Sequence, residues 1–184
     1  MIMIFKFLIF ILISVRVLIL DVNSQIPTNT LPSLKTIDAG SVNVSTSNNS
    51  LNINQSSQQA IISWNSFNVG SSAKVNFNQP SASATTLNKI FDARPSQIFG
   101  QINANGKIIL QNSAGIYFGP SSTLNVGSIV ATTGTISNQD FLNNKFNFSR
   151  NNSKGNIVNE GSLKAIDNFV ALLAPNGRNA KTVK

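Results

Sequence analysis

Cysteine and histidine are both absent from this chain of 184 residues. These two residue types supply most zinc ligands, every thiol nucleophile and the base of a Ser-His-Asp triad. Their absence excludes those sites, and it also excludes the disulfides that many secreted proteins of this size carry. A chain without disulfides suits transport through a narrow pore in an unfolded state, because a disulfide formed early would close a loop that cannot thread the pore.

Charged residues are also scarce. They make up 11% of the chain, less than half of the usual share. Basic residues outnumber acidic ones by 14 to 6, which gives a formal net charge of +8. The lysines and arginines are scattered singly, without the stacking aromatics that nucleic-acid binding requires. We therefore expect no nucleic-acid partner.

The few carboxylates are spread too thinly for catalysis. After the first 24 residues the acidic side chains are Asp38, Asp92, Asp140, Glu160 and Asp167. A polysaccharide-active enzyme, the minor alternative for a β-rich chain, needs clustered carboxylates for acid–base chemistry or calcium. We expect no enzyme, no metal site and no cofactor, and we interpret Asp92 and Arg94 as a solvated ion pair.

The N-terminus is the one long apolar segment. A lone charge, Lys6, precedes the nine-residue apolar run 7–15, the arrangement of a signal peptide. We predict a signal peptide over residues 1–24, cut between Ser24 and Gln25. The alternative is an uncleaved membrane anchor, which would place Arg16 in the apolar stretch at a cost of roughly 2.5–3.5 kcal/mol near the bilayer centre. We therefore expect no integral membrane anchor after cleavage.

Asn and Ser together make up roughly a quarter of the chain, an unusual share, and they alternate with apolar residues. In the stretch 112–133, Ile116 and Phe118 alternate before Gly119, and the pattern repeats over 124–127. Short strands that end at glycine, with no helix signal between them, are typical of successive rungs of a β-solenoid.

The remaining chain also has a strand pattern. Val42 and Val44 are expected to face Leu51 and Ile53 across a hairpin that turns at 48–49. Three further segments are expected to form strands: 60–70, with Trp64 in the core or a cap; 74–80, ended by Pro80; and 132–137, as another rung. Residues 155–177 are expected to form two strands, one of them the apolar run 169–174, buried on both sides. Residues 140–149 are expected to form a surface loop.

Two segments leave alternatives open. Residues 85–90 could form one turn of helix. The Asn105–Gly106 turn fits a second hairpin or the corner of a β-helix. A single rung cannot stabilise itself and must stack on a neighbour. We therefore predict an all-β fold, a stacked β-solenoid with small antiparallel hairpin or cap elements, with a β-sandwich as the alternative.

Five blocks in order carry a resemblance to a known family, at residues 51–70, 74–90, 95–112, 112–133 and 158–175. They resemble the TPS, or haemagglutination-activity, domain that opens filamentous haemagglutinin-like exoproteins of two-partner secretion. The resemblance assigns residues 25–184 to this domain and implies that its all-β fold is a right-handed parallel β-helix. One departure is Asn112-Ser113-Ala114-Gly115, where the family has Asn-Pro-Asn-Gly, so the proline that fixes φ is lost.

The resemblance implies a route of export. The chain would cross the inner membrane into the periplasm, be bound in extended form by the POTRA domains of a TpsB-type outer-membrane β-barrel, and fold at the cell surface as part of a secreted adhesin. The residues expected to be recognised are Asn112, Gly115, Ile116, Phe118 and Gly119, with Asn52 and Asn54 as a second patch. Because family members continue far beyond the length of this chain, the alternative is a stand-alone or truncated adhesin that binds host-cell glycans or surfaces.

Overall fold

The structure, a computed structural model, describes residues 26–166 and 169–180. The predicted signal peptide and the cleavage site at Ser24 and Gln25 lie outside these residues. Within the described part of the chain, no helix is long and apolar enough to cross a membrane.

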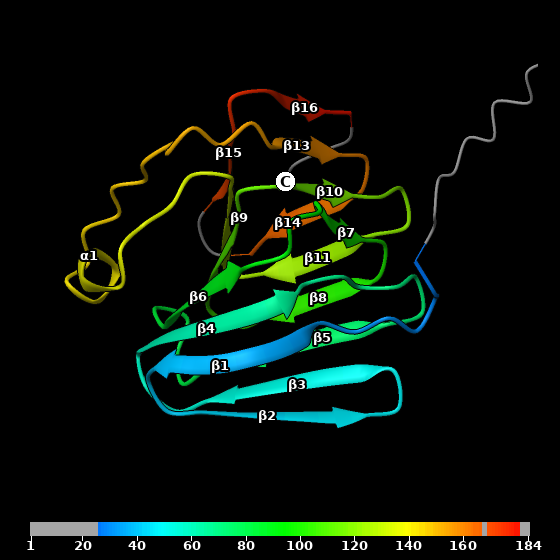
Figure 1. Cartoon of the computed structure of the whole chain (residues 1–184). Coiled ribbons are helices and arrows are strands. Elements are labelled where there is room, and N and C mark those ends of the chain that lie inside the picture. The colour runs from blue at the N-terminus through cyan, green and yellow to red at the C-terminus, as the bar shows by residue number, and fades with distance from the viewer. Residues whose placement is uncertain (1–25, 167–168, 181–184) are drawn as a thin grey trace, which may run out of the picture.

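The described chain is almost entirely β-structure, with strands stacked in successive layers along one axis (Figure 1). The strands are β1 (Ser33–Ala39), β2 (Val42–Ser47), β3 (Ser50–Gln55), β4 (Gln59–Ser66), β5 (Lys74–Asn78), β6 (Thr85–Ile90), β7 (Ser96–Ile98), β8 (Gln101–Ala104), β9 (Lys107–Asn112), β10 (Gly115–Phe118), β11 (Thr123–Val126), β12 (Ser128–Thr132), β13 (Asn156–Asn159), β14 (Ser162–Ala165), β15 (Val170–Leu173) and β16 (Gly177–Asn179). A short helix, α1 (Asn138–Leu142), lies to one side.

The strands form three sheets. Sheet A has the order β1-β4-β6-β9-β12-β15, sheet B the order β14-β11-β8-β5-β3-β2, and sheet C the order β16-β13-β10-β7. The chain visits sheets B, A and C in turn, and apart from the pairs β1–β4 and β2–β3 all neighbouring strands are parallel. This is the right-handed parallel β-helix expected from the sequence.

The core lies inside the coil, where one side chain of each rung stacks on its equivalent in the next. In sheet B the parallel register aligns Leu51, Val75, Ile102, Leu124 and Leu163. All five are at most 3% exposed. The alternation in the sequence therefore sends every second residue inward, as strand geometry requires.

The N-terminal end is covered by antiparallel strands. β2 and β3 form the predicted hairpin, in which Val44 pairs with Ile53. The turn lies at residues 48–49, and Asn48 has a φ of 50°. β1 runs antiparallel to β4 and closes the edge of sheet A. The prediction of small antiparallel cap elements is thus confirmed.

Both segments with open alternatives are resolved. Residues 85–90 form the strand β6, because the parallel neighbours β4 and β9 take up its backbone hydrogen bonds. The Asn105–Gly106 turn is a corner between sheets B and A. There the Asn105 side chain accepts from the backbone N–H of Gln79 at 2.7 Å, and the Gly106 N–H donates to Gln79 Oε1 at 2.9 Å.

The prediction of a rung at residues 132–137 is wrong. β12 ends at Thr132, and residues 133–155 then leave the coil as an insertion that includes α1. Within the described part of this insertion, the only β-bridge joins Thr135 to Ser149. This insertion stays outside because its apolar side chains pack on the outer face of sheet A: Ile136 and Phe141 cluster with Ile61, Leu87 and Ile109. The helix was not predicted, whereas residues 143–148 form the expected surface loop.

The C-terminal part also differs from its prediction. Four strands, β13 to β16, replace the expected two. The run 169–174, expected to be buried on both sides, is half-exposed along β15, with Phe169 50% and Leu173 43% exposed. The reason is that, among the residues that the structure describes, β15 pairs only with β12 and is the last strand of sheet A.

Candidate transporter-recognition residues

The main group of predicted recognition residues lies on and beside β10, and its apolar members point into the coil. Ile116 is 1% and Phe118 0% exposed. They are two residues apart and therefore share one face of the strand, as predicted. In the folded protein that face is the core, so neither side chain is available at the surface.

Asn112 is fully buried at the end of β9. Its Nδ2 donates to Ser96 Oγ at 3.0 Å, and its Oδ1 accepts from the backbone N–H of Ala114 at 2.9 Å. A side chain that accepts from the backbone two residues on stabilises a turn by itself. Asn112 thus holds the corner before β10 without the proline that the family pattern has there.

Two glycines fix the limits of β10. Gly115 has a φ of +122°, and a Cβ at this position would lie 2.8 Å from the carbonyl oxygen of Asn156. This left-handed φ requires glycine, because no other residue fits without strain. At Gly119 an added Cβ would collide with the ring of Phe99. Both glycines are explained by the fold.

Asn52 and Asn54 lie elsewhere, on the outer face of β3 in sheet B. Asn52 Oδ1 accepts from Asn76 Nδ2 at 3.0 Å, and Asn76 Oδ1 accepts in turn from Asn103 Nδ2 at 2.9 Å. The amides thus form a ladder along the axis. A second pair of amides is linked in the same way, with Asn78 Nδ2 donating to Asn54 Oδ1 at 2.8 Å.

The partners in this ladder were not predicted as functional residues. The signal that identifies them is an Asn-x-Asn pattern that recurs in β3, in β5 and at the end of β8. Its first asparagines, Asn52, Asn76 and Asn103, are 24 and 27 residues apart. Such a repeat, at a spacing close to one coil, places equivalent amides in register on the outer face.

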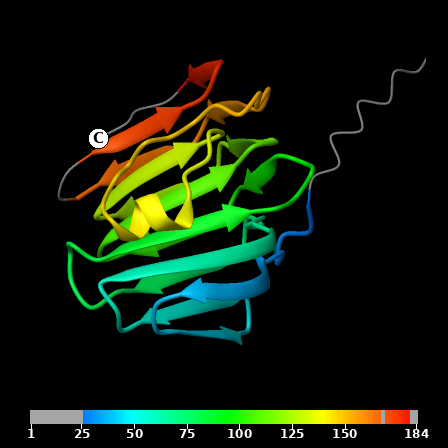
Figure 2. The same cartoon turned by 60° about the vertical axis from the view of Figure 1, so that its left-hand side comes forward.

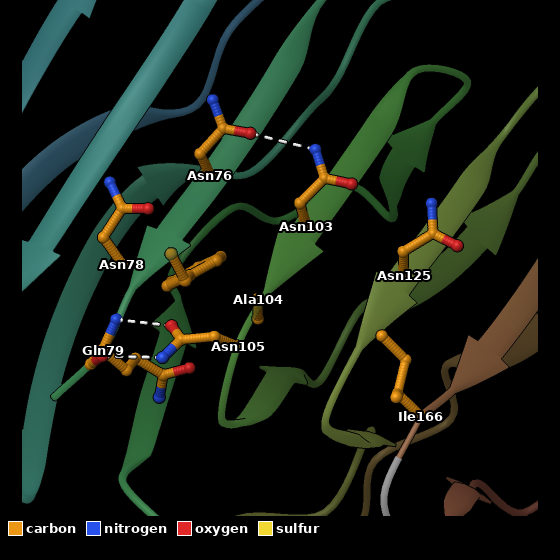
Figure 3. Close-up of a pocket in the computed structure, with 9 residues that line it drawn as sticks. Asn76, Asn78, Gln79, Asn103, Ala104, Asn105, Asn125 and Ile166 are labelled. Atoms are coloured by element: carbon orange, nitrogen blue, oxygen red, sulfur yellow. Dashed lines mark hydrogen bonds between the residues drawn. The ribbon is translucent and has the colours of Figure 1, made fainter. Parts of the chain in front are cut away.

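The ladder borders a hollow of about 450 Å³ (Figure 3). Asn76, Asn103 and Asn125 approach it from adjacent strands, and the side chain of Ile166, which is 65% exposed, lies at its edge. Asn125 pairs in register with Asn103. Among the described residues, its amide makes no side-chain hydrogen bond.

The structure does not bring the two predicted patches together. The first group is buried at the end of β9 and along β10 of sheet C, whereas Asn52 and Asn54 lie on the outside of sheet B. Only the second patch is accessible in the folded domain. The first becomes accessible only when the rung is unfolded.

The ionisable groups are few and form small clusters on the surface. Tyr117 donates from its hydroxyl to Glu160 Oε2 at 2.6 Å, and Arg178 pairs with the same carboxylate. The hydrogen bond to Glu160, then burial, then the negative charge of Glu160 raise the pKa of Tyr117 above its ordinary value, while Arg178 lowers it. The predicted pair of Asp92 and Arg94 is also present, at 3.5 Å. Residues 26–166 and 169–180 contain no group of three or more His, Cys, Asp or Glu that could hold a metal ion.

Comparisons with known proteins agree with this geometry. A family model described as "TPS secretion domain" matches residues 25–184. Two curated proteins from Haemophilus influenzae, each described as "Heme/hemopexin-binding protein", are similar in sequence. One is 33% identical over 135 residues, 72% of this chain and 15% of that protein, and the other is 32% identical over 111 residues, 60% of this chain and 12% of that protein. The chain therefore spans less than a sixth of the length of these relatives.

The solved structures include one with the same fold, the HMW1 secretion domain from Haemophilus influenzae. It superposes with a TM-score of 0.79 at 26% identity, and the match covers 83% of this chain and 41% of that one. The β-helix, the order of the five sequence blocks and the family match lead to one assignment. The chain belongs to the TPS secretion domain family of two-partner secretion exoproteins.

Proposed function

We propose that this chain is the export signal of an exoprotein, recognised by the POTRA domains of a TpsB-type outer-membrane transporter while it is still extended. The folded domain then forms at the cell surface. In this proposal the domain is not an enzyme, and its function is to direct export of the exoprotein by binding the transporter.

The observation that carries the proposal is the burial of the predicted recognition residues. Asn112 and Phe118 are fully buried and Ile116 is 1% exposed. A partner that contacts them must therefore bind before the rung forms. Strand addition suits such binding, because backbone hydrogen bonds provide affinity and alternate side chains provide specificity. The absence of disulfides fits a chain that crosses the outer membrane unfolded.

The test is export of a double variant, Asn112→Ala with Phe118→Ala, co-expressed with a matching TpsB-type transporter. We expect the variant to remain in the periplasm while the wild-type chain reaches the medium. Secretion of the variant at the wild-type level, with the transporter still essential, would place recognition elsewhere in the domain.

A matched control separates recognition from folding. Asn88 and Phe77 are as deeply buried as the tested pair, and Asn88 Oδ1 accepts from Trp64 Nε1 at 3.0 Å. Asn88→Ala with Phe77→Ala should therefore destabilise the fold to a similar degree outside the candidate segment. We expect this control to be captured by the transporter and exported more efficiently than the Asn112 and Phe118 variant.

The route through the periplasm requires removal of the signal peptide. We propose cleavage after Ser24, so the mature protein begins at Gln25. Intact-mass spectrometry of the secreted protein measures this directly. A mass that retains residues 1–20 in extracted membranes would indicate an anchor instead.

A second function is favoured by the amide-lined hollow on sheet B. We propose that, if the folded domain also acts as an adhesin, it binds neutral glycans there. The Asn103 and Asn125 amides offer donors and acceptors for sugar hydroxyls, and the exposed Ile166 offers an apolar contact. A glycan-binding assay on the purified domain, with Asn125→Ala as the variant, tests this. Equal binding by the variant and the wild type would exclude the hollow.

The relatives' printed descriptions name haem and hemopexin. Haem iron is most often held by His or Cys, and this chain has neither. Haem ligation through those residue types is therefore excluded for this chain, and the export role is the part of the relatives' function that we assign to it.

A further inference from the structure

The outer face of sheet A carries a row of apolar side chains along the axis, and the insertion covers only part of it. At the N-terminal part, Ile136 and Phe141 cover Ile61 and Leu87. Figure 2 shows α1 in front of these strands, with the loop after it running on toward the last rungs. The row continues through Val130 and Ala171, which are Cα partners in β12 and β15.

This continuation forms an apolar groove, which we call the sheet A groove. Its floor is Val130 and Ala171, its wall is Phe146 and Phe148 of the insertion, and Leu173 lies at its far end. The volume is about 470 Å³, within the roughly 300–1,000 Å³ that is typical of small-molecule sites. Phe148 and Leu173 also line an adjoining hollow of about 360 Å³, so a linear molecule has room to extend.

One side of the groove is polar and contains a hydroxyl without a partner. Ser128, the first residue of β12, lines the groove and is 2% exposed, and its Oγ makes no hydrogen bond to any described residue. Buried side-chain hydroxyls are almost always hydrogen-bonded, so an unpaired one requires an explanation. A ligand atom in the groove would provide the missing partner.

A basic residue pairs with Ser128 across the sheet. Lys107, the first residue of β9, is the Cα partner of Ser128 and also lines the groove. Among the described residues that line the groove, Lys107 is the only charged one. The two ion pairs in the described chain, of Asp92 with Arg94 and of Glu160 with Arg178, do not involve it.

We propose that the sheet A groove binds a single-chain alkyl carboxylate, a free fatty acid, with its carboxylate at Lys107 and Ser128. One carboxylate oxygen accepts from the ammonium group and the other from the Ser128 hydroxyl. The alkyl chain lies over Val130 and Ala171 against the ring of Phe146. A carboxylate fits better than a phosphate monoester, because the latter carries close to two charges at neutral pH and the groove offers a single cation. This site does not depend on the proposed export function.

The experiment is isothermal titration of the purified protein with dodecanoate, below its micelle concentration, at neutral pH. Dodecanol and dodecyltrimethylammonium serve as probes with the same chain and a neutral or cationic head. We expect dodecanoate to bind at one site, at least about tenfold more tightly than the other two, because only it forms a charge-assisted hydrogen bond. No binding of dodecanoate, or equal binding of all three probes, would overturn the proposal.

Three variants locate the site. Lys107→Gln and Ser128→Ala should each weaken dodecanoate about tenfold, and Ala171→Phe should abolish binding by filling the groove. Thermal unfolding of each variant checks that it is folded, and Ser128→Ala removes only one oxygen from an outer position. Unchanged affinity in Lys107→Gln or Ser128→Ala overturns the proposal.

Matched controls use residues of the same type outside the head-group position. Thr133 Oγ1 is the other buried hydroxyl without a partner in the described chain, so Thr133→Val tests whether any such hydroxyl matters. Lys164→Gln removes an exposed lysine from β14 in sheet B. Both should keep wild-type affinity. Binding to anionic lipid vesicles that dodecanoate does not compete would identify a membrane surface instead and would also overturn the proposal.

Discussion

At the N-terminal end of the β-helix, Trp64 and Phe67 are fully buried, whereas at the last described rung Phe169 is 50% and Leu173 43% exposed. At the first end, residues 26–32 and the antiparallel strands β1 and β2 lie over the coil, and the Gly70 N–H donates to the Thr30 carbonyl at 2.9 Å. At the other end the described residues contain no such cover.

The difference shows that burial in this fold depends on the neighbouring rung as much as on the strand itself. A strand in the middle of sheet A, such as β9, has parallel neighbours on both edges, and Leu110 in it is 1% exposed. Within residues 26–166 and 169–180, β15 has one neighbouring strand, and Leu172 in it is only partly buried. Each rung thus stabilises the next, as in other solenoids.

The largest expected effect comes from replacing a large buried side chain at the N-terminal end by alanine. Trp64 packs edge-on against Phe67, with ring centroids 5.3 Å apart, and donates to Asn88. Trp64→Ala should lower the free energy of unfolding by roughly 3–5 kcal/mol. Leu172→Ala, in the half-buried last rung, should lower it by only about 1 kcal/mol. Equilibrium urea unfolding measures both, and equal losses would show that the last rung is packed as tightly as the first.

A smaller effect is expected from backbone strain, again with a matched position in the last rung. Gly115→Val introduces a β-branched residue at a φ of +122° and should cost roughly 1–3 kcal/mol. Gly177→Ala should be close to neutral, because the nearest atom to an added Cβ there is 3.9 Å away. Thermal unfolding of the two variants tests this. A stable Gly115→Val protein would contradict the turn geometry.

The amide ladder offers a third and weaker test. Asn76 is hydrogen-bonded on both sides, to Asn52 and to Asn103, so Asn76→Ala should lower the free energy of unfolding by about 1–2 kcal/mol. Asn125→Ala, whose side chain has no such bond within the described residues, should change it by less than about 0.5 kcal/mol. If Asn125→Ala were the more damaging variant in urea unfolding, the ladder would not be a source of stability.

Much of the coil could be predicted from the sequence, because its signals are local. The alternation of Ile116 and Phe118, the glycine at 115 and the Asn105–Gly106 turn each specify backbone conformation within a few residues. What is not local was missed. α1 has five residues, too short for a helical periodicity, and it packs on Ile61 and Leu87 from distant strands.

The candidate site was predicted less completely than the fold. The sequence pattern correctly placed Ile116 and Phe118 on one face, but a period of two does not show whether that face is the core or the surface. Similarly, the run 169–174 is apolar enough for a strand buried on both sides. It is half-exposed because the described part of the chain gives β15 no second neighbouring strand. The unpaired hydroxyl of Ser128 has no sequence signal, since its environment is assembled from β9, β12 and the insertion.

The smallest expected effect concerns how the last rungs are held to the inner ones. Tyr117, on β10, donates to Glu160, which follows β13, and this bond raises the pKa of Tyr117. Because the pKa in the folded state lies above the ordinary value of about 10, the neutral tyrosine stabilises the fold fully below that pH. This contribution is lost as the pH rises through the folded-state pKa. Thermal unfolding between pH 8 and pH 11 should therefore show the wild type more stable than Tyr117→Phe at the lower pH, with the difference shrinking above about pH 10. Packing on Phe99, whose ring centroid lies 5.6 Å away, is kept in the Phe variant, so the difference reports the hydroxyl alone. A difference that stayed constant over this range would mean that the ionisation of Tyr117 is not linked to folding and that the hydrogen bond to Glu160 does not help to hold the last rungs.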